Sequence, residues 1–305
     1  MKKIGWLFIS MIAVLIIAGC GSSDGEASGG GEGTPDKLVM GFVPSQDSDT
    51  IADTVKPLAD KLAEKLGGVE VEGKVMTNYT ALVEAMGTNE VQIGFIPAFA
   101  YVLANEKHDV EVILKSERYG SGTYKAQYLV RSDSDIKNLE DLEGKVWAYG
   151  DPTSTSGYLF PAAQIMDEFN VENPETDFFS NSIQTGGHDN SAIAVYNEEA
   201  DVATTFDDVR TELEEEYPDI MDKLSVLTYT SEIPNDTISV TSELNDEFVQ
   251  KIKDTFLGFN EEEEMIKIMN DVYSWDAIIE AEDSEYDVVR DTYEKFSDSI
   301  SINDL

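Results

Sequence analysis

Three consecutive hydroxyl side chains, Ser154, Thr155 and Ser156, stand in the stretch DPTSTSGYLFP, just before a glycine and an apolar run. Ser and Thr are favoured at helix starts because their oxygens accept hydrogen bonds from the free backbone N–H groups there. One hydroxyl is enough for such a cap. A helix N-terminus also carries partial positive charge and free donors that suit a phosphate-like anion. Three hydroxyls in a row therefore favour a cradle for a tetrahedral oxyanion over a plain cap.

This stretch does not fit two other chemistries. The P-loop pattern G-x-x-x-x-G-K-[ST], which is typical of proteins that hydrolyse nucleotides, occurs nowhere in the chain. TSTSG does not match the nucleophile elbow G-x-S-x-G of serine hydrolases. Ser156, His188 and Asp208 can be drawn as a triad, but any long sequence offers such a trio.

His188 is the second candidate, in the stretch QTGGHDNSAIAVYN between paired glycines and an amphipathic helix. A histidine at such a helix entry can be solvated or can cap the helix. It can also donate a hydrogen bond to an oxyanion, especially if the anion raises its pKa. A metal site needs three or four ligands, and His188 with Asp189 has no recognisable ligand spacing. We therefore expect neither a metal nor a cofactor.

The elements that must position these residues alternate between strands and helices. Apolar residues three and four apart predict helices, and short apolar or alternating runs predict strands. In the first part of the chain the predicted strands are 37–45, 69–77 and 91–97, and the predicted helices are 49–67, 78–90 and 98–107. Alternation of this kind is typical of a parallel or mixed sheet covered by helices.

A second α/β module begins with the alternating strand YKAQYLVRSDSD at 124–135 and returns to the first module through 224–244. Two lobes joined by two crossings are the natural interpretation, although a single doubly wound sheet also satisfies the pattern. The predicted organisation is a signal peptide, a tether, a first lobe in two segments and a second lobe between them: 1–19, 20–36, 37–126 with 233–305, and 127–232.

The amino terminus predicts where the protein is found. Lys2 and Lys3 precede an apolar run at 4–17 that is short for a membrane span and typical of a secretory signal. Cys20 is the only cysteine, so no internal disulfide can form. A Gly/Ser-rich segment without apolar periodicity follows and is typical of a flexible tether, which argues against Cys20 as a buried free thiol.

The charge balance limits the partners. Asp and Glu outnumber Lys and Arg by 61 to 21, giving a formal net charge of −40 at pH 7. Such a surface repels nucleic acid and anionic lipid, which argues against both as direct partners. It also indicates a saline external medium, because salt screens the self-repulsion.

Four stretches in order, DPTSTSG, GGHDNSAIAV, DVATTFDD and IPNDTISV, resemble the phosphate/phosphite/phosphonate-binding proteins of ABC importers. Cys20 after Ile17-Ala18-Gly19 is similar to the lipoprotein box of such proteins. The resemblance implies a type II periplasmic-binding-protein fold, in which two α/β lobes close on a ligand about a hinge of two crossing strands. It implies no covalent chemistry, and a monomer that captures a small phosphorus oxyanion outside the cell and delivers it to a membrane permease and its ATPase.

The resemblance also implies ligand-binding roles for residues at matching positions. These positions are Tyr79, Tyr124, Ser154, Thr155, Ser156, His188, Asp208 and Asp236, with Cys20 as the lipidated residue. Tyr128 is the alternate to Tyr124, and Asp207 the alternate to Asp208, because strand alternation sends only one of two neighbours into the cleft.

The resemblance leaves the ligand open. In receptors for aminoalkylphosphonates a glutamate and an aspartate hold the ammonium, and Asp208 is one methylene shorter than that glutamate. Phosphite, methylphosphonate and phosphate fit the pattern equally well, and neutral donors alone are expected to bind the dianion. Two other functions remain open: a sensor that presents the same ligand to a membrane receptor, and a secreted phosphoester hydrolase.

Overall fold

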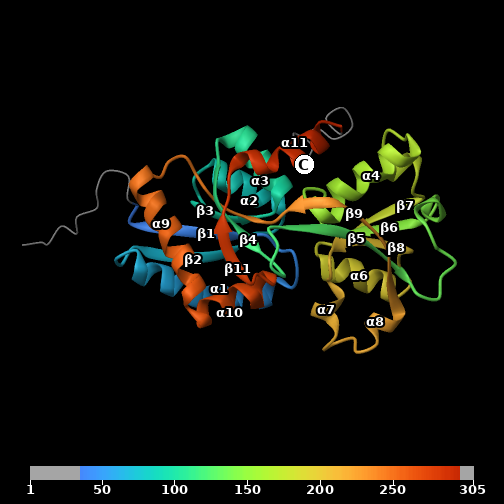
Figure 1. Ribbon diagram of the computed structural model, residues 1–305, viewed down its shortest axis with the longest axis horizontal. Helices are drawn as coiled ribbons and strands as arrows, with labels where there is room; N and C mark the ends of the chain where they lie inside the picture. Colours follow the sequence, from blue (N-terminus) through green and yellow to red (C-terminus); the bar gives the residue numbers. More distant parts are fainter. Residues whose placement is uncertain (1–34, 296–305) are drawn as a thin grey trace, which may run out of the picture.

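The computed structural model describes residues 35–295, so the expected signal peptide, Cys20 and most of the tether lie outside the described residues. Two α/β units stand side by side, each built around its own sheet (Figure 1). The single doubly wound sheet that the pattern also allowed is therefore excluded. The buried apolar residues of both units form one cluster, packed between the sheets and the helices.

The first unit, lobe 1, contains a six-stranded mixed sheet in the order β11-β4-β10-β3-β1-β2. β1 is parallel to β2 and β3, whereas β10 is antiparallel to β3 and β4. The strands are β1 (Lys37–Phe42), β2 (Glu70–Val75), β3 (Ile93–Ile96), β4 (Glu111–Glu117), β10 (Thr237–Val240) and β11 (Ala277–Glu280). The chain thus contributes to this sheet from both of its ends.

Helices cover both faces of this sheet: α2, α3 and α11 above it in Figure 1, and α1 and α10 below. The helices of lobe 1 are α1 (Ser48–Lys65), α2 (Tyr79–Gly87), α3 (Ala98–His108), α9 (Asp246–Gly258), α10 (Glu263–Tyr273) and α11 (Asp287–Glu294), with 3₁₀ turns at Phe259–Glu261 and Asp283–Tyr286. In α1, Ile51, Val55, Leu58 and Leu62 form the apolar stripe that the sequence predicts, and all four are buried.

The second unit, lobe 2, contains a five-stranded sheet in the order β7-β6-β8-β5-β9. β6 is parallel to β7 and β8, and β5 is antiparallel to β8 and β9. Its strands are β5 (Thr123–Arg131), β6 (Val146–Tyr149), β7 (Asn181–Gln184), β8 (Val202–Phe206) and β9 (Leu224–Pro234). Its helices are α4 (Phe160–Phe169), α5 (Pro174–Asp177), α6 (His188–Tyr196), α7 (Arg210–Leu213) and α8 (Ile220–Lys223), with a 3₁₀ turn at Leu139–Leu142 and a π-helical turn at Thr155–Leu159 that runs into α4.

Two short crossings join the lobes, 118–122 between β4 and β5 and 235–236 between β9 and β10. The Asn235 side-chain amide ties them together, donating to the carbonyl oxygens of Ser116 at 3.0 Å and Ser121 at 2.8 Å. The lobe boundaries expected from the sequence, 126/127 and 232/233, fall inside β5 and β9, because both strands continue the second sheet almost to the crossings.

No helix within residues 35–295 combines the length and the apolar character that a membrane crossing needs.

Candidate functional site

A small cavity of about 30 Å³ lies between the lobes and is lined from both of them and from the crossings. Six residues predicted from the sequence line it: Tyr79, Tyr124, Ser154, Ser156, His188 and Asp236. The structure therefore brings together groups that are far apart in the chain. The other two, Thr155 and Asp208, do not line it.

Ser154 combines the two roles that the sequence set against each other. Its Oγ accepts a hydrogen bond from the Gly157 backbone N–H at 3.0 Å, so it caps the π-helical turn that leads into α4. The same Oγ lies 3.4 Å from Nε2 of His188 and faces the cavity. Ser156 also lines the cavity, and the first N–H groups of a helix have no intrahelical acceptor. The start of this helical stretch thus presents two hydroxyls to the cavity.

Thr155, between these serines, forms a hydrogen bond that links the two lobes. Its Oγ1 accepts a hydrogen bond from the Phe99 backbone N–H at 2.9 Å. Phe99 lies in the first turn of α3, and the N-cap residue of that helix, Pro97, has no side-chain hydrogen bond to offer. A hydroxyl of lobe 2 therefore satisfies a helix-start donor of lobe 1. The expectation that the Thr155 side chain lines the cavity is not met, because its hydroxyl is committed to this contact.

Glycines allow the two loops of lobe 2 to approach each other beneath the cavity. Gly186 has a φ of +86°, which few side chains tolerate, and its N–H donates to the Gly150 carbonyl at 2.9 Å. A Cβ on Gly150 would lie 3.2 Å from the Gly187 carbonyl carbon. The paired glycines of QTGGH thus bring His188 next to the loop that carries Ser154.

His188 is the first residue of α6, and its backbone N–H donates to the Ser45 carbonyl of lobe 1 at 2.9 Å. Burial lowers the pKa of its imidazole from 6.5 to about 3, and the nearby Arg118 charge adds to the effect. The ring is therefore neutral near pH 7. Nδ1 is buried without a hydrogen-bond partner among the described residues. One ring nitrogen is thus available to a ligand as donor or acceptor, according to the tautomer.

Three tyrosines line the cavity: Tyr273, whose hydroxyl donates to the Val43 carbonyl at 2.9 Å, Tyr79 and Tyr124. Tyr79 begins α2, where Asn78 accepts a hydrogen bond from the Ala81 N–H at 2.7 Å. Tyr124 lies at the start of β5, beside the first crossing. Burial raises the phenol pKa of Tyr79 and Tyr124, so each is a neutral donor. The alternate, Tyr128, donates instead to the Pro161 carbonyl at 2.9 Å and does not line the cavity.

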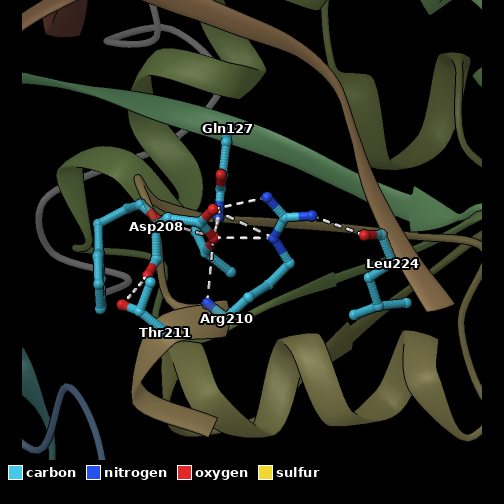
Figure 2. A network of polar contacts seen from close by, with 7 residues as sticks. Gln127, Asp208, Arg210, Thr211 and Leu224 are labelled. Atoms are coloured by element: carbon cyan, nitrogen blue, oxygen red, sulfur yellow. Dashed lines mark hydrogen bonds and ion pairs between the residues drawn. The ribbon is translucent and has the colours of Figure 1, made fainter. Parts of the chain in front are cut away.

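Asp208 lies outside the cavity, in the polar network of Figure 2. Its carboxylate pairs with the Arg210 guanidinium at 2.6 Å and accepts from the Gln127 amide at 3.0 Å. Asp207, the alternate, accepts from the Lys125 N–H at 3.3 Å and is also absent from the cavity lining. β8 ends at Phe206, so strand alternation does not extend to either aspartate; Phe206 itself lines the cavity.

Arg118 is a cavity-lining residue that the sequence analysis missed. It is only 6 % exposed, and its guanidinium carbon lies 4.8 Å from the centre of the Phe206 ring. On the opposite crossing, burial raises the pKa of Asp236, while the Arg118 charge lowers it in part. The sequence signal was weak: Arg118 stands in SERYGSG, which has the composition of a turn.

The lining offers hydrogen-bond donors, one guanidinium and one carboxylate, that of Asp236. No group of three or more His, Cys, Asp and Glu side chains among residues 35–295 is placed to hold a metal ion. Such a set of donors can desolvate and hold an anion.

Comparisons with known proteins agree with this arrangement. Residues 40–286 match the family model described as "ABC transporter, phosphonate, periplasmic substrate-binding protein". The chain is 29% identical over 294 residues to the phosphate-import protein PhnD of Mycolicibacterium smegmatis, covering 90% of this chain and 91% of the relative. It is 27% identical over 227 residues to the phosphonates-binding periplasmic protein of Escherichia coli, covering 73% of this chain and 66% of the relative.

Solved structures share the fold. The binding component of a phosphonate ABC transporter from Pseudomonas aeruginosa aligns with a TM-score of 0.77 at 23% identity, covering 87% of this chain and 89% of that one. PhnD1 from Prochlorococcus marinus, solved with methylphosphonate, aligns with a TM-score of 0.75 at 19% identity, covering 89% and 100%. The predicted type II periplasmic-binding-protein fold is confirmed.

Proposed function

Because the chain belongs to the family of phosphonate-type periplasmic substrate-binding proteins of ABC transporters, we propose that its cavity binds a phosphorus oxyanion of the phosphonate, phosphite or phosphate type. The observation that carries this proposal is the lining itself. Hydroxyls of Ser154 and Ser156, the neutral His188 ring and two of the three phenols converge on one enclosed space. Hydrogen bonds to an ionised oxygen are each worth about 1.5–3 kcal/mol, so several together outweigh the negative surface.

Lobe closure is the proposed mechanism. Lobe 1 supplies Tyr79 to the cavity and lobe 2 supplies Ser154, Ser156 and His188, so a bound anion contacts both. A ligand that makes more contacts in the closed state shifts the population of open and closed forms toward closure. The Phe99–Thr155 and His188–Ser45 hydrogen bonds stabilise the same closed form. We propose that the ligand is released chemically unchanged.

We further propose that the protein is a monomer, anchored outside the cell through a lipid on Cys20, that delivers its ligand to a permease and its ATPase. The signal, the lone cysteine and the tether of the sequence support the anchor. Replacing Cys20 by Ala should move the protein from the membrane fraction to the medium. A Cys20→Ala protein that stays in the membrane fraction would refute the lipid anchor.

Calorimetry with methylphosphonate, phosphite and phosphate tests the proposed site. Ser156→Ala should weaken the ligand that binds by about tenfold or more, because one charge-assisted hydrogen bond is lost. Ser180→Ala is the matched control: Ser180 is exposed in lobe 2, and its Oγ donates only to the Lys145 carbonyl. Equal affinities in both variants would remove Ser156 from the site, and the absence of binding by the unmodified protein would refute the proposed function.

A further inference from the structure

Arg118 is held in the cavity wall by its own crossing and by two aromatic rings of lobe 2. It follows β4 directly, and its backbone N–H and carbonyl exchange hydrogen bonds with Ser121 at 3.0 and 2.9 Å, which fixes the turn of the first crossing. Its guanidinium lies over the Phe206 ring of lobe 2 at 4.8 Å and near the Tyr124 ring at 6.0 Å. The side chain is therefore placed by aromatic contacts that leave its Nε–H free.

One donor of this guanidinium, its Nε, is unpaired among the described residues. This atom is buried, and no ion pair involving Arg118 occurs within the same part of the chain. An arginine remains charged at any pH that a folded protein tolerates. A buried, permanent cation with an unpaired donor is costly unless an anion arrives to accept from it. The arrangement is thus incomplete without an anionic ligand.

The cavity also contains one carboxylate, that of Asp236 on the second crossing. It lies near enough to Arg118 for the two charges to affect each other, but the two groups form no ion pair. Asp236 thus offsets the arginine charge without occupying its Nε–H. The unpaired donor points to a ligand that carries negative charge and brings no positive charge of its own.

Resting on the function proposed above, we propose that Arg118 determines specificity: it makes the cavity select phosphorus oxyanions that carry no cationic group. An ammonium on the ligand would be drawn to Asp236, the carboxylate of the lining, whose charge Arg118 already offsets. Such a ligand would place its ammonium beside the guanidinium and meet like-charge repulsion. Asp208, the second carboxylate expected near the ligand, cannot compensate, because Arg210 neutralises it outside the cavity.

A matched pair of ligands tests this on the unmodified protein. Ethylphosphonate and 2-aminoethylphosphonate have the same carbon skeleton and differ by one ammonium group. Calorimetry should show ethylphosphonate binding at least about tenfold more tightly, since a desolvated like-charge contact is avoided. Equal or tighter binding of 2-aminoethylphosphonate would overturn this inference and leave the proposed function standing. If neither ligand binds, and methylphosphonate, phosphite and phosphate also fail, the proposed function falls and this inference falls with it.

Variants assign the preference to Arg118. Arg118→Gln should reduce the ratio of the two affinities by about tenfold, and Arg118→Lys, which keeps the charge, should retain most of it. Arg131→Gln is the control, because it removes the same charge from an arginine that pairs with Asp133 and Glu198 away from the cavity. An equal loss of affinity for both ligands in Arg118→Gln would make Arg118 a structural residue of the crossing and overturn the proposal. If Arg118→Gln does not fold, the wild-type ratio and the lysine variant decide.

Discussion

Two aspartate–arginine pairs in this protein have opposite arrangements. Asp208 and Arg210, two residues apart, form a contact ion pair at 2.6 Å, and Arg210 also donates to the Leu224 carbonyl (Figure 2). Asp236 and Arg118 belong to different crossings, line the cavity and form no ion pair, although their charges affect each other. In the first pair the two charged groups hydrogen-bond each other. In the second, the Nε of Arg118 has no acceptor among the described residues.

The difference separates a structural role from a binding role. A guanidinium with a carboxylate in bidentate contact and a carbonyl acceptor has little left to give a ligand. A guanidinium held only by aromatic rings keeps its charge and its N–H groups available. The same two residue types therefore have different roles, and the groups that surround them in the fold determine whether the role is structural or ligand binding.

Removing the ion pair of Asp208 and Arg210 should have the largest effect. Asp208→Ala leaves Arg210 without its carboxylate, and because the two side chains are only 25% and 14% exposed, we expect a loss of about 3 kcal/mol in the free energy of unfolding. Denaturant unfolding measures this. Ligand affinity should change by less than about twofold, since the pair lies outside the cavity. A large loss of affinity with normal stability would reverse the roles assigned to the two pairs.

The pH dependence of stability tests His188, which lines the same cavity as Arg118 and Asp236. Burial, with a contribution from Arg118, lowers its folded-state pKa to about 3, while the unfolded chain has its ordinary value. Below about pH 6.5 the unfolded state therefore binds the extra proton, and this contribution to stability, complete above that pH, falls by about 2 kcal/mol down to pH 5.

Unfolding curves at several pH values give the free energy of unfolding as a function of pH. Below about pH 6.5 this free energy should fall less steeply in His188→Gln than in the unmodified protein. Arg118→Gln should change this slope little, because burial is the larger cause of the lowered pKa. An unchanged slope in His188→Gln would mean that His188 is not buried in its neutral form.

Neutralising Asp236, the carboxylate near Arg118, should strengthen binding of the anionic ligand. Asp236→Asn removes the negative charge that faces an incoming anion and leaves the Arg118 charge without its offset. We expect an affinity for methylphosphonate about tenfold higher, equivalent to about 1.4 kcal/mol. Calorimetry checks this, with Asp135→Asn as control, because Asp135 is an exposed carboxylate of lobe 2 outside the cavity lining. Weaker binding in Asp236→Asn would show that the carboxylate itself contacts the ligand.

In the proposed closure of the lobes around the ligand, the Thr155 hydroxyl supplies one hydrogen bond between the lobes. Thr155→Val removes the acceptor of the Phe99 N–H, and the closed state should lose about 1 kcal/mol, or about fivefold in affinity. Thr155→Ser keeps the hydroxyl and should bind like the unmodified protein. Identical affinities for Val and Ser would exclude this hydrogen bond from the closure equilibrium.

Local patterns predicted much of the fold. The apolar stripe of α1, the cap at Asn78 before α2 and the alternation in β5 are properties of short stretches, and these elements form where the sequence predicts them. Ser154, Ser156 and His188 could also be predicted, because helix starts after glycine or hydroxyl residues are local features. The motif order then linked them to one family.

What the sequence could not predict depends on contacts between distant segments. The sequence places Arg118 in a turn, and the pairing of β4 with β10 together with the Asn235 hydrogen bonds brings its crossing next to that of Asp236. Thr155 differs from its serine neighbours only because α3 of lobe 1 presents a free N–H to it. The resemblance placed Asp208 among the ligand-binding residues, but β8 ends at Phe206 and Asp208 pairs with Arg210 outside the cavity lining.

A crystal structure of the protein with methylphosphonate tests the central claim most directly. The account predicts that the phosphonate oxygens lie in the cavity between Ser156 and His188 and accept a hydrogen bond from Nε of Arg118. A phosphonate bound elsewhere, or bound in the cavity with the Arg118 guanidinium turned away from it, would contradict the account.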